Sequence, residues 1–174
     1  IRIIFDVTRG IEKARIIEGG VEIKSYEIRG GRDKKEYIEG FGNFCSFTTV
    51  GEMKPTALIK DKKSTEHDGA AMNNYVELDV SRGVGSHQGA LHDKNGGHSG
   101  GCIRQSAADA KWLFNYVKAH STMNGGQIAC TDVTVTVIDN SRVPNLEGKI
   151  VPVAEARKEC FGRSGRQDPI RSLV

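Results

Sequence analysis

A cysteine and a histidine, fifteen positions apart, are the residues of this chain best placed to do chemistry. Cys102 follows two glycines, so little side-chain bulk surrounds its sulfur. His87 ends a short predicted strand, and the glycine-rich loop 88–101 after it is long enough to turn back and bring the imidazole to the thiol. A thiolate–imidazolium pair is the usual arrangement for nucleophilic cysteine catalysis. We therefore predict that Cys102 is the nucleophile and His87 its base.

The segment that follows the cysteine predicts a helix. Residues 107–119 carry apolar side chains at helical spacing, Ser106 can cap the first turn, and Asp109 completes a variant of the capping box. The apolar face consists of Ala110, Leu113, Phe114 and Val117. Because a helix N-terminus carries positive potential, we expect it to favour the thiolate form of Cys102.

Residues 99–104 read Ser-Gly-Gly-Cys-Ile-Arg, and His87 stands two residues before Gly89. These residues resemble the active-site signature of the L,D-transpeptidases, the YkuD-type enzymes of the bacterial cell wall. In that signature His-Gly follows a strand, and Ser-His-Gly-Cys-Ile-Arg precedes a helix. Residues 48–53 resemble the family's Thr-Pro-Thr-Gly-x-Phe segment, and the likeness extends loosely over residues 1–140.

Two positions depart from the family's pattern. Gly100 stands where the family often has a second histidine, and Gln88 is inserted after His87. His98 either occupies the space of the missing histidine or is a solvated histidine of the loop.

The resemblance implies L,D-transpeptidation of peptidoglycan stem peptides, without a cofactor or a metal. Cys102 would attack the carbonyl of the third stem residue, expel the terminal D-alanine and form a thioester that an amine resolves. The backbone N–H groups of Gly101 and Cys102 would hold the oxyanion. If water resolved the thioester, the enzyme would be an L,D-carboxypeptidase or endopeptidase, and the sequence leaves that choice open.

Four residues are candidates for substrate binding: Arg104, Ser99, His98 and Tyr75. Arg104 would either bind a substrate carboxylate or hold the cysteine loop through backbone carbonyls. Ser99 is suited to side-chain bonds with the loop backbone. Tyr75 would either line a substrate groove or pack in the core.

Three other classes of function fit the sequence less well. Imidazole, carboxylate and thiolate are zinc ligands, but the spacing of His87, His92, His98, Asp93 and Cys102 matches no standard zinc site, so we predict no metal. A catalytically silent wall-binding module would not need the pairing of cysteine and histidine. An unrelated cysteine hydrolase or sortase-like transferase is disfavoured by the order of nucleophile and helix.

Composition limits the class of protein. The 174 residues predict one domain, and a net charge of +3 is too small for a nucleic-acid footprint. No run approaches the roughly 20 apolar residues of a membrane-spanning helix. We interpret the chain as a mature or trimmed form that acts in the periplasm or the cell wall after removal of a signal peptide. The oligomeric state is left open, with a monomer expected.

The pattern of strands predicts a mostly β domain, a β-sandwich or barrel with one principal helix after the cysteine. The expected strands cover residues 1–8, 13–18, 21–29, 41–48, 70–80, 84–87 and 128–138. Residues 30–36 and 61–68 are expected to be loops, and residues 123–126 to end the preceding structure. We expect residues 1–140 to form the catalytic domain, and 141–174 to be a C-terminal extension packed on it, with a helical turn at 154–159.

The remaining cysteines allow at most one disulfide if Cys102 stays free. Cys130 with Cys160 would tie the C-terminal segment to the last clear strand. The alternative is that Cys45, Cys130 and Cys160 are all buried free thiols.

Overall fold

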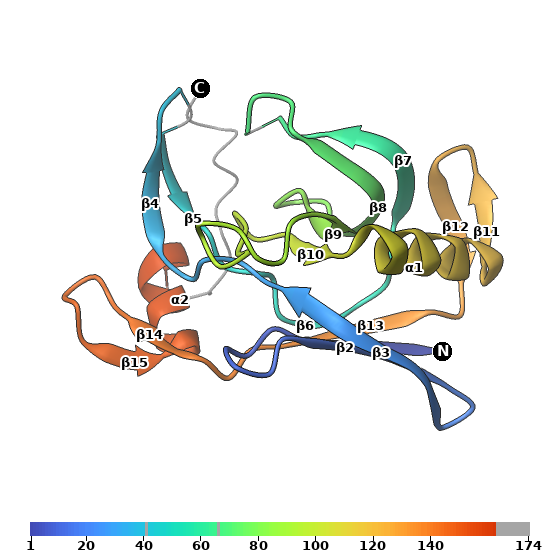
Figure 1. The fold of residues 1–174 in the computed structure, drawn as a ribbon, viewed down its shortest axis with the longest axis horizontal. Helices are drawn as coiled ribbons and strands as arrows, with labels where there is room; N and C mark the ends of the chain where they lie inside the picture. The colour runs from blue at the N-terminus through green and yellow to red at the C-terminus, as the bar shows by residue number, and fades with distance from the viewer. Residues whose placement is uncertain (41, 66, 163–174) are drawn as a thin grey trace.

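The computed structural model describes residues 1–40, 42–65 and 67–162 of the chain (Figure 1). The strands and helices, in chain order, are β1 (Arg2–Asp6), β2 (Lys13–Glu18), β3 (Val21–Arg29), β4 (Lys35–Ile38), β5 (Gly42–Cys45), β6 (Gly51–Met53), β7 (Ala57–Lys63), β8 (Ala71–Asp79), β9 (Val84–Gln88), β10 (Ile103–Gln105), α1 (Ala107–Ala119), β11 (Ser121–Asn124), β12 (Gln127–Thr131), β13 (Thr134–Ile138), β14 (Arg142–Pro144), β15 (Ile150–Pro152) and α2 (Val153–Phe161).

One large curled sheet dominates the fold. Its strand order is β11-β12-β7-β8-β9-β10-β3-β2-β1-β13-β6, and the pairs β4–β5 and β14–β15 form two small separate sheets. Helix α1 lies between the β7–β9 part of the sheet and the β1–β3 part (Figure 1). The predicted mostly β fold with a helix after the cysteine loop is confirmed, and the sheet has the form of a half-barrel.

Helix α1 has the predicted bounds and the predicted buried face. Ala110, Leu113, Phe114 and Val117 are all buried, and the last three lie in one apolar cluster with side chains from both halves of the sheet. The Oγ of Ser106 accepts a hydrogen bond from the backbone N–H of Asp109 at 3.1 Å, which closes the first turn. The sequence therefore predicted helix α1 correctly, and the sheet curls around this helix.

Four expectations about the strands were wrong. The single strand expected over 128–138 is two strands: β12 pairs with β11 and β7, whereas β13 lies between β1 and β6. Residues 123–126 do not end the structure but contain the turn of the β11–β12 hairpin. The loops expected over 30–36 and 61–68 both overlap strands, because β4 pairs with β5 and β7 extends to Lys63 in its pairing with β8. Alternation of apolar residues predicts a strand but not the strand that it pairs with. The errors therefore concern which strands are neighbours and where one strand ends and the next begins.

The expected disulfide between Cys130 and Cys160 was wrong. Cys160, on α2, is bonded to Cys45 of β5, and Cys130 is an exposed free thiol. The reason is topological: Cys130 lies on β12, at the opposite end of the molecule from α2 (Figure 1). Sequence proximity between the last strand and the C-terminal segment was therefore misleading.

The C-terminal elements pack on the segment that follows β5. The ring of Phe161 contacts that of Phe47 edge to face, with ring centroids 5.7 Å apart. The buried Arg157 donates a hydrogen bond to the carbonyl oxygen of Thr48 and lies 3.7 Å from the carboxylate of Asp139. The predicted helical turn at 154–159 lies within α2. The division of the chain at residue 140 stays a prediction.

Candidate functional site

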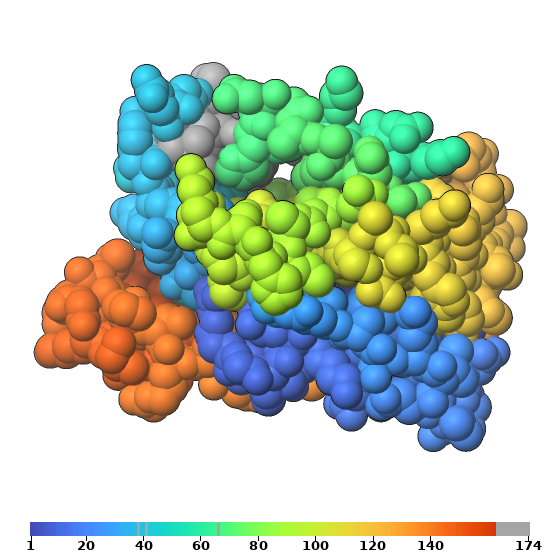
Figure 2. Space-filling model, viewed as in Figure 1, coloured from blue at the N-terminus to red at the C-terminus, as the bar shows by residue number. Residues whose placement is uncertain are grey.

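A cavity of about 810 Å³ contains both residues predicted to do chemistry, Cys102 and His87. Its walls come from strand β9, from loop 88–101, from the β7–β8 connection and from the β4–β5 hairpin. Figure 2 shows a hollow between loop 88–101 and the β7–β8 segment. The cavity therefore joins segments that are far apart in the sequence.

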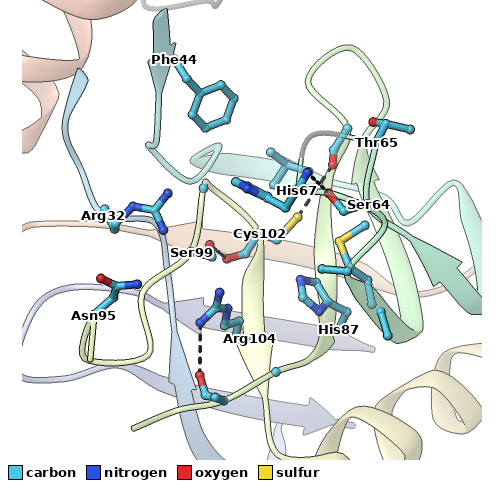
Figure 3. A pocket seen from close by; sticks show the side chains of 18 of the residues that line it. Arg32, Phe44, Ser64, Thr65, His67, His87, Asn95, Ser99, Cys102 and Arg104 are labelled. Carbon is cyan, nitrogen blue, oxygen red and sulfur yellow. Dashed lines mark hydrogen bonds between the residues drawn. The ribbon is translucent and has the colours of Figure 1, made fainter. Parts of the chain in front are cut away.

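Parallel pairing of β9 with β10 sets the position of the thiol relative to the imidazole. Arg104 pairs with His87 and Ile103 pairs with Ser86, so Cys102 enters the sheet beside the strand that carries the histidine. The thiol forms no disulfide and is half-buried, and its Sγ lies 3.8 Å from the carbonyl oxygen of Gly83. Figure 3 shows the side chains of Cys102, which immediately precedes β10, and His87 of β9 in the same pocket.

The hydrogen bonding of His87 defines which ring nitrogen can accept a proton. Nδ1 lies 2.7 Å from the backbone oxygen of Gln88. Because a carbonyl oxygen can only accept, Nδ1 carries the proton, and Nε2 is left with its lone pair. The ring of Tyr75 stacks against the imidazole, with centroids 6.3 Å apart, and restricts its orientation.

Burial makes the neutral imidazole the resting form of His87. The side chain is 6% exposed, and burial, together with the nearby charge of Arg104, lowers its pKa to about 4. The lowered pKa argues against a preformed thiolate–imidazolium pair, because charging the buried ring is unfavourable. His87 is suited instead to accept the thiol proton as the reaction proceeds.

The expected effect of the helix on the thiol also needs correction. Helix α1 begins at Ala107, and strand β10 (Ile103–Gln105) separates it from Cys102. Because the influence of the helix dipole falls off within the first turn, it does not act directly on this sulfur.

Ser99 fixes the backbone around the cysteine. Its Oγ accepts a hydrogen bond from the N–H of Gly101 at 3.0 Å and donates one to the carbonyl oxygen of Cys102. The N–H of Ser99 in turn donates to the carbonyl oxygen of Gly30. A Cβ on the neighbouring Gly31 would lie 2.0 Å from the backbone oxygen of Ser46, so only glycine fits this close approach of backbones.

This arrangement bears on the oxyanion role expected for Gly101. Its N–H is directed to Ser99 and not into the cavity. In this structure, therefore, Gly101 shapes the loop, and the donor expected from its backbone is already used.

Arg104 lines the cavity and holds loop 88–101. Its Nη1 donates to the carboxylate of Asp93 at 3.0 Å and to the backbone oxygen of Gly97 at 3.2 Å. The carbonyl oxygen of Ala90 lies 3.5 Å away. Of the two roles considered for this arginine, the observed contacts are those that hold the loop.

Two candidates for substrate binding lie outside the cavity wall. Tyr75 is fully buried in strand β8, and its hydroxyl donates to the carbonyl oxygen of Gly83 at 3.0 Å. The Nε2 of His98 lies 2.5 Å from the carboxylate of Glu12. Tyr75 thus packs against His87, and His98 does not fill the place beside the cysteine that its position in the loop suggested.

Two of the cavity residues that sequence reasoning missed bear most directly on the cysteine, His67 and Arg82. His67 belongs to the polar β7–β8 connection, and nothing in its local sequence pointed to the cysteine. Arg82 follows β8; it donates to the backbone oxygen of Cys45 at 3.2 Å, and its guanidinium lies 4.7 Å from the ring centroid of Phe161. Through Arg82 the disulfide-linked helix α2 supports one wall of the cavity.

Metal binding finds no support in the arrangement of the histidines. Nδ1 of His87 bonds to Gln88, His92 lies 3.3 Å from Glu27, and His98 bonds to Glu12. Among residues 1–40, 42–65 and 67–162, no three His, Cys, Asp or Glu side chains are grouped as metal ligands. The absence of a metal requirement stays a prediction. In the same described ranges, neither helix has the length and apolar character needed to cross a membrane.

Comparison with known families and structures gives a consistent result. Residues 2–152 match the model of the YkuD family, described as the L,D-transpeptidase catalytic domain. A search of curated proteins finds no significant match.

Solved L,D-transpeptidases have the same fold. One from Xylanimonas cellulosilytica is 17% identical, with a TM-score of 0.58 over 78% of this chain and 59% of that one. L,D-transpeptidase 1 of Mycobacterium tuberculosis is 16% identical, with a TM-score of 0.53 over 79% and 62% of the two chains. The enzyme LdtMt1, solved in complex with imipenem, is 15% identical, with a TM-score of 0.53 over 79% and 58%. This chain therefore spans less than two thirds of the length of these proteins.

Proposed function

Because the chain belongs to the YkuD family of L,D-transpeptidase catalytic domains, we propose that it transfers acyl groups between peptidoglycan stem peptides. Cys102 is the nucleophile and His87 the base. The observation that carries this assignment is the cavity that contains both the thiol of Cys102, which forms no disulfide, and His87, whose Nδ1 is bonded to the backbone oxygen of Gln88 and whose Nε2 is thereby left to accept a proton.

The first half of the reaction forms a thioester. Sγ of Cys102 bonds to the carbonyl carbon of the third stem residue while Nε2 of His87 takes the thiol proton. The C–N bond to the terminal D-alanine then breaks, and the amine leaves with that proton. An amine of a second stem peptide then attacks the thioester and gives a proton to Nε2 of His87; the C–S bond breaks, and the thiolate takes that proton to restore the thiol.

The charge of the cavity wall suits an anionic peptide. The cationic side chains that line it are Arg32, Lys34, Lys62, Arg82 and Arg104, and the acidic ones are Glu36 and Asp93. Both acidic side chains are paired, Glu36 with Arg32 and Asp93 with Arg104. The excess of positive charge favours stem peptides, which end in a carboxylate. With this substrate, the protein acts outside the cytoplasm, at the cell wall.

Product analysis tests the proposal. Purified disaccharide-tetrapeptide muropeptides are incubated with the protein, and the products are separated and weighed by mass spectrometry. We expect free D-alanine together with dimers linked between third stem residues. The Cys102→Ala variant should give neither product, and Cys130→Ala, which changes an exposed thiol on β12, should behave as the parent. Unchanged muropeptides with the parent protein would contradict the proposal.

A further inference from the structure

We infer that His67 is a further catalytic residue, which donates a hydrogen bond from Nε2 to the oxyanion formed on the acyl carbonyl; this inference rests on the proposed function. His67 comes from the β7–β8 connection, yet it lines the cavity together with Cys102 and His87. Figure 3 shows the two histidines on opposite sides of the Cys102 sulfur in that view. One imidazole is therefore positioned to take the proton, and the other to meet the developing negative charge.

The contact with Gly100 brings Nε2 of His67 close to the cysteine loop. A Cβ built on Gly100 would lie 3.0 Å from this nitrogen, so the ring occupies space that any larger residue would need. Gly100 is two residues before the nucleophile. The glycine at this position thus has a physical reason, which is to admit an imidazole from a distant loop.

The ring of His67 is available to a ligand. In each of the other four histidines a ring nitrogen has a polar partner: Gln88 for His87, Glu27 for His92, Glu12 for His98 and Asp132 for His120. Within the described part of the chain, no hydrogen bond or ion pair uses a ring nitrogen of His67. A neutral imidazole with its proton on Nε2 is a hydrogen-bond donor.

The backbone of His67 is held in place although its side chain is exposed. Its N–H donates to the Oγ of Ser64 at 3.1 Å, and its carbonyl oxygen accepts from the N–H of Ala70 at 2.9 Å. The N–H of Ser64 donates to the carbonyl oxygen of Ala70 at 2.9 Å and closes the turn. These bonds hold the Cα of His67, from which the imidazole extends, in the wall of the cavity. A donor held in place before the reaction is what stabilises an oxyanion.

A side-chain donor is also needed, because one of the two backbone N–H groups expected to hold the oxyanion already has a partner. The N–H of Gly101 is bonded to Ser99, and its use in the oxyanion site would require that bond to break. When Sγ attacks, the π electrons of the carbonyl move to its oxygen, and the charge is stabilised by any N–H aimed at it. His67 supplies such an N–H without disturbing the cysteine loop.

The test compares two reactions of the same thiol. Acylation by imipenem passes through an oxyanion, whereas alkylation by iodoacetamide displaces iodide and forms none. Intact-mass spectrometry gives both rates for the parent, His67→Ala, His67→Gln and His67→Phe. We expect His67→Ala and His67→Phe to slow acylation about 100-fold and to leave alkylation unchanged. His67→Gln, which keeps an N–H donor, should recover part of the rate.

Two controls separate this role from loss of structure. His92→Ala, which removes an exposed histidine of loop 88–101, should leave both rates unchanged. Gly100→Ala places a Cβ against Nε2 and should slow acylation in the parent but have little further effect in His67→Ala. Additive effects of the two substitutions would overturn the assigned contact.

The outcomes distinguish the two levels of the proposal. If imipenem does not acylate Cys102 of the parent, the proposed function fails, and this inference fails with it. If the parent is acylated and His67→Ala is acylated at the same rate, this inference alone is overturned. An equal fall in acylation and alkylation would show that His67 acts through the thiol and would overturn its role as oxyanion donor.

Discussion

Replacing His87 with glutamine should make the stability of the protein less dependent on pH. Burial lowers the pKa of His87 from 6.5 to about 4 in the folded protein, whereas the unfolded chain keeps the ordinary value. Between these two values the unfolded state binds more protons, so the parent loses stability as the pH falls. Glutamine cannot be protonated and should not show this loss.

The size of the effect follows from the two pKa values. On going from pH 7 to pH 5, the linkage relation gives a loss of about 2 kcal/mol in the free energy of unfolding of the parent, on top of what His87→Gln loses. The buried Asp33, whose pKa is raised to about 7 by burial and by the charge of Asp139, also titrates in this range. It is common to both proteins, and its contribution cancels in the comparison.

The assay is denaturation by urea at the two pH values, followed by fluorescence of Trp112. His92→Gln serves as the control, because the side chain of His92 is mostly exposed. It should lose as much stability as the parent. If the parent and His87→Gln lost equal free energies between pH 7 and pH 5, the neutral buried imidazole would be refuted, and with it the form of the base in the mechanism.

Three further predictions concern the frame of the site. Ser99→Ala should slow imipenem acylation and raise proteolysis within loop 88–101, since its Oγ bonds both Gly101 and Cys102; equal rates in limited proteolysis would contradict this. Cys160→Ser should lower the free energy of unfolding by about 2–5 kcal/mol in urea titrations, because the disulfide closes a loop with a sequence separation of 115. Cys130→Ser should have no such effect, and equal losses would refute the assigned pairing. Ser106→Ala should cost about 1 kcal/mol in the same assay through loss of the N-cap, and an unchanged midpoint would count against it.

Helix α1 and the chemistry-bearing pair were predictable because their signals are local. The spacing of Leu113, Phe114 and Val117 defines one face of a helix, and Ser106 marks its start. The positions of Cys102 and His87 at the two ends of a glycine-rich loop likewise indicated a common site, and both line the same cavity.

The errors arose where long-range topology decides the outcome. The run 128–138 alternates regularly, yet β12 and β13 pair with strands in different parts of the sheet. Cys160 pairs with Cys45, which is 115 positions away, because α2 packs against β5. His67 reaches the site through the curl of the sheet, and no pattern in residues 61–68 could have shown this.

The charge state of the base was also beyond the sequence. A histidine and a cysteine in one site favour an ion pair when the site is wet, but burial of His87 lowers its pKa enough to reverse that preference. Residue types and their spacing thus predicted which two side chains share the cavity, while the protonation of His87 depends on how deeply the fold buries it.

The most direct test of the central claim is to trap the acyl-enzyme. The protein is mixed with a stem tetrapeptide, quenched in acid and digested, and the modified peptide is identified by mass spectrometry. The proposed mechanism predicts a tripeptide acyl group on Cys102, absent from Cys102→Ala and strongly reduced in His87→Ala. An adduct on the exposed Cys130, or no adduct at all under conditions in which D-alanine is released, would contradict it.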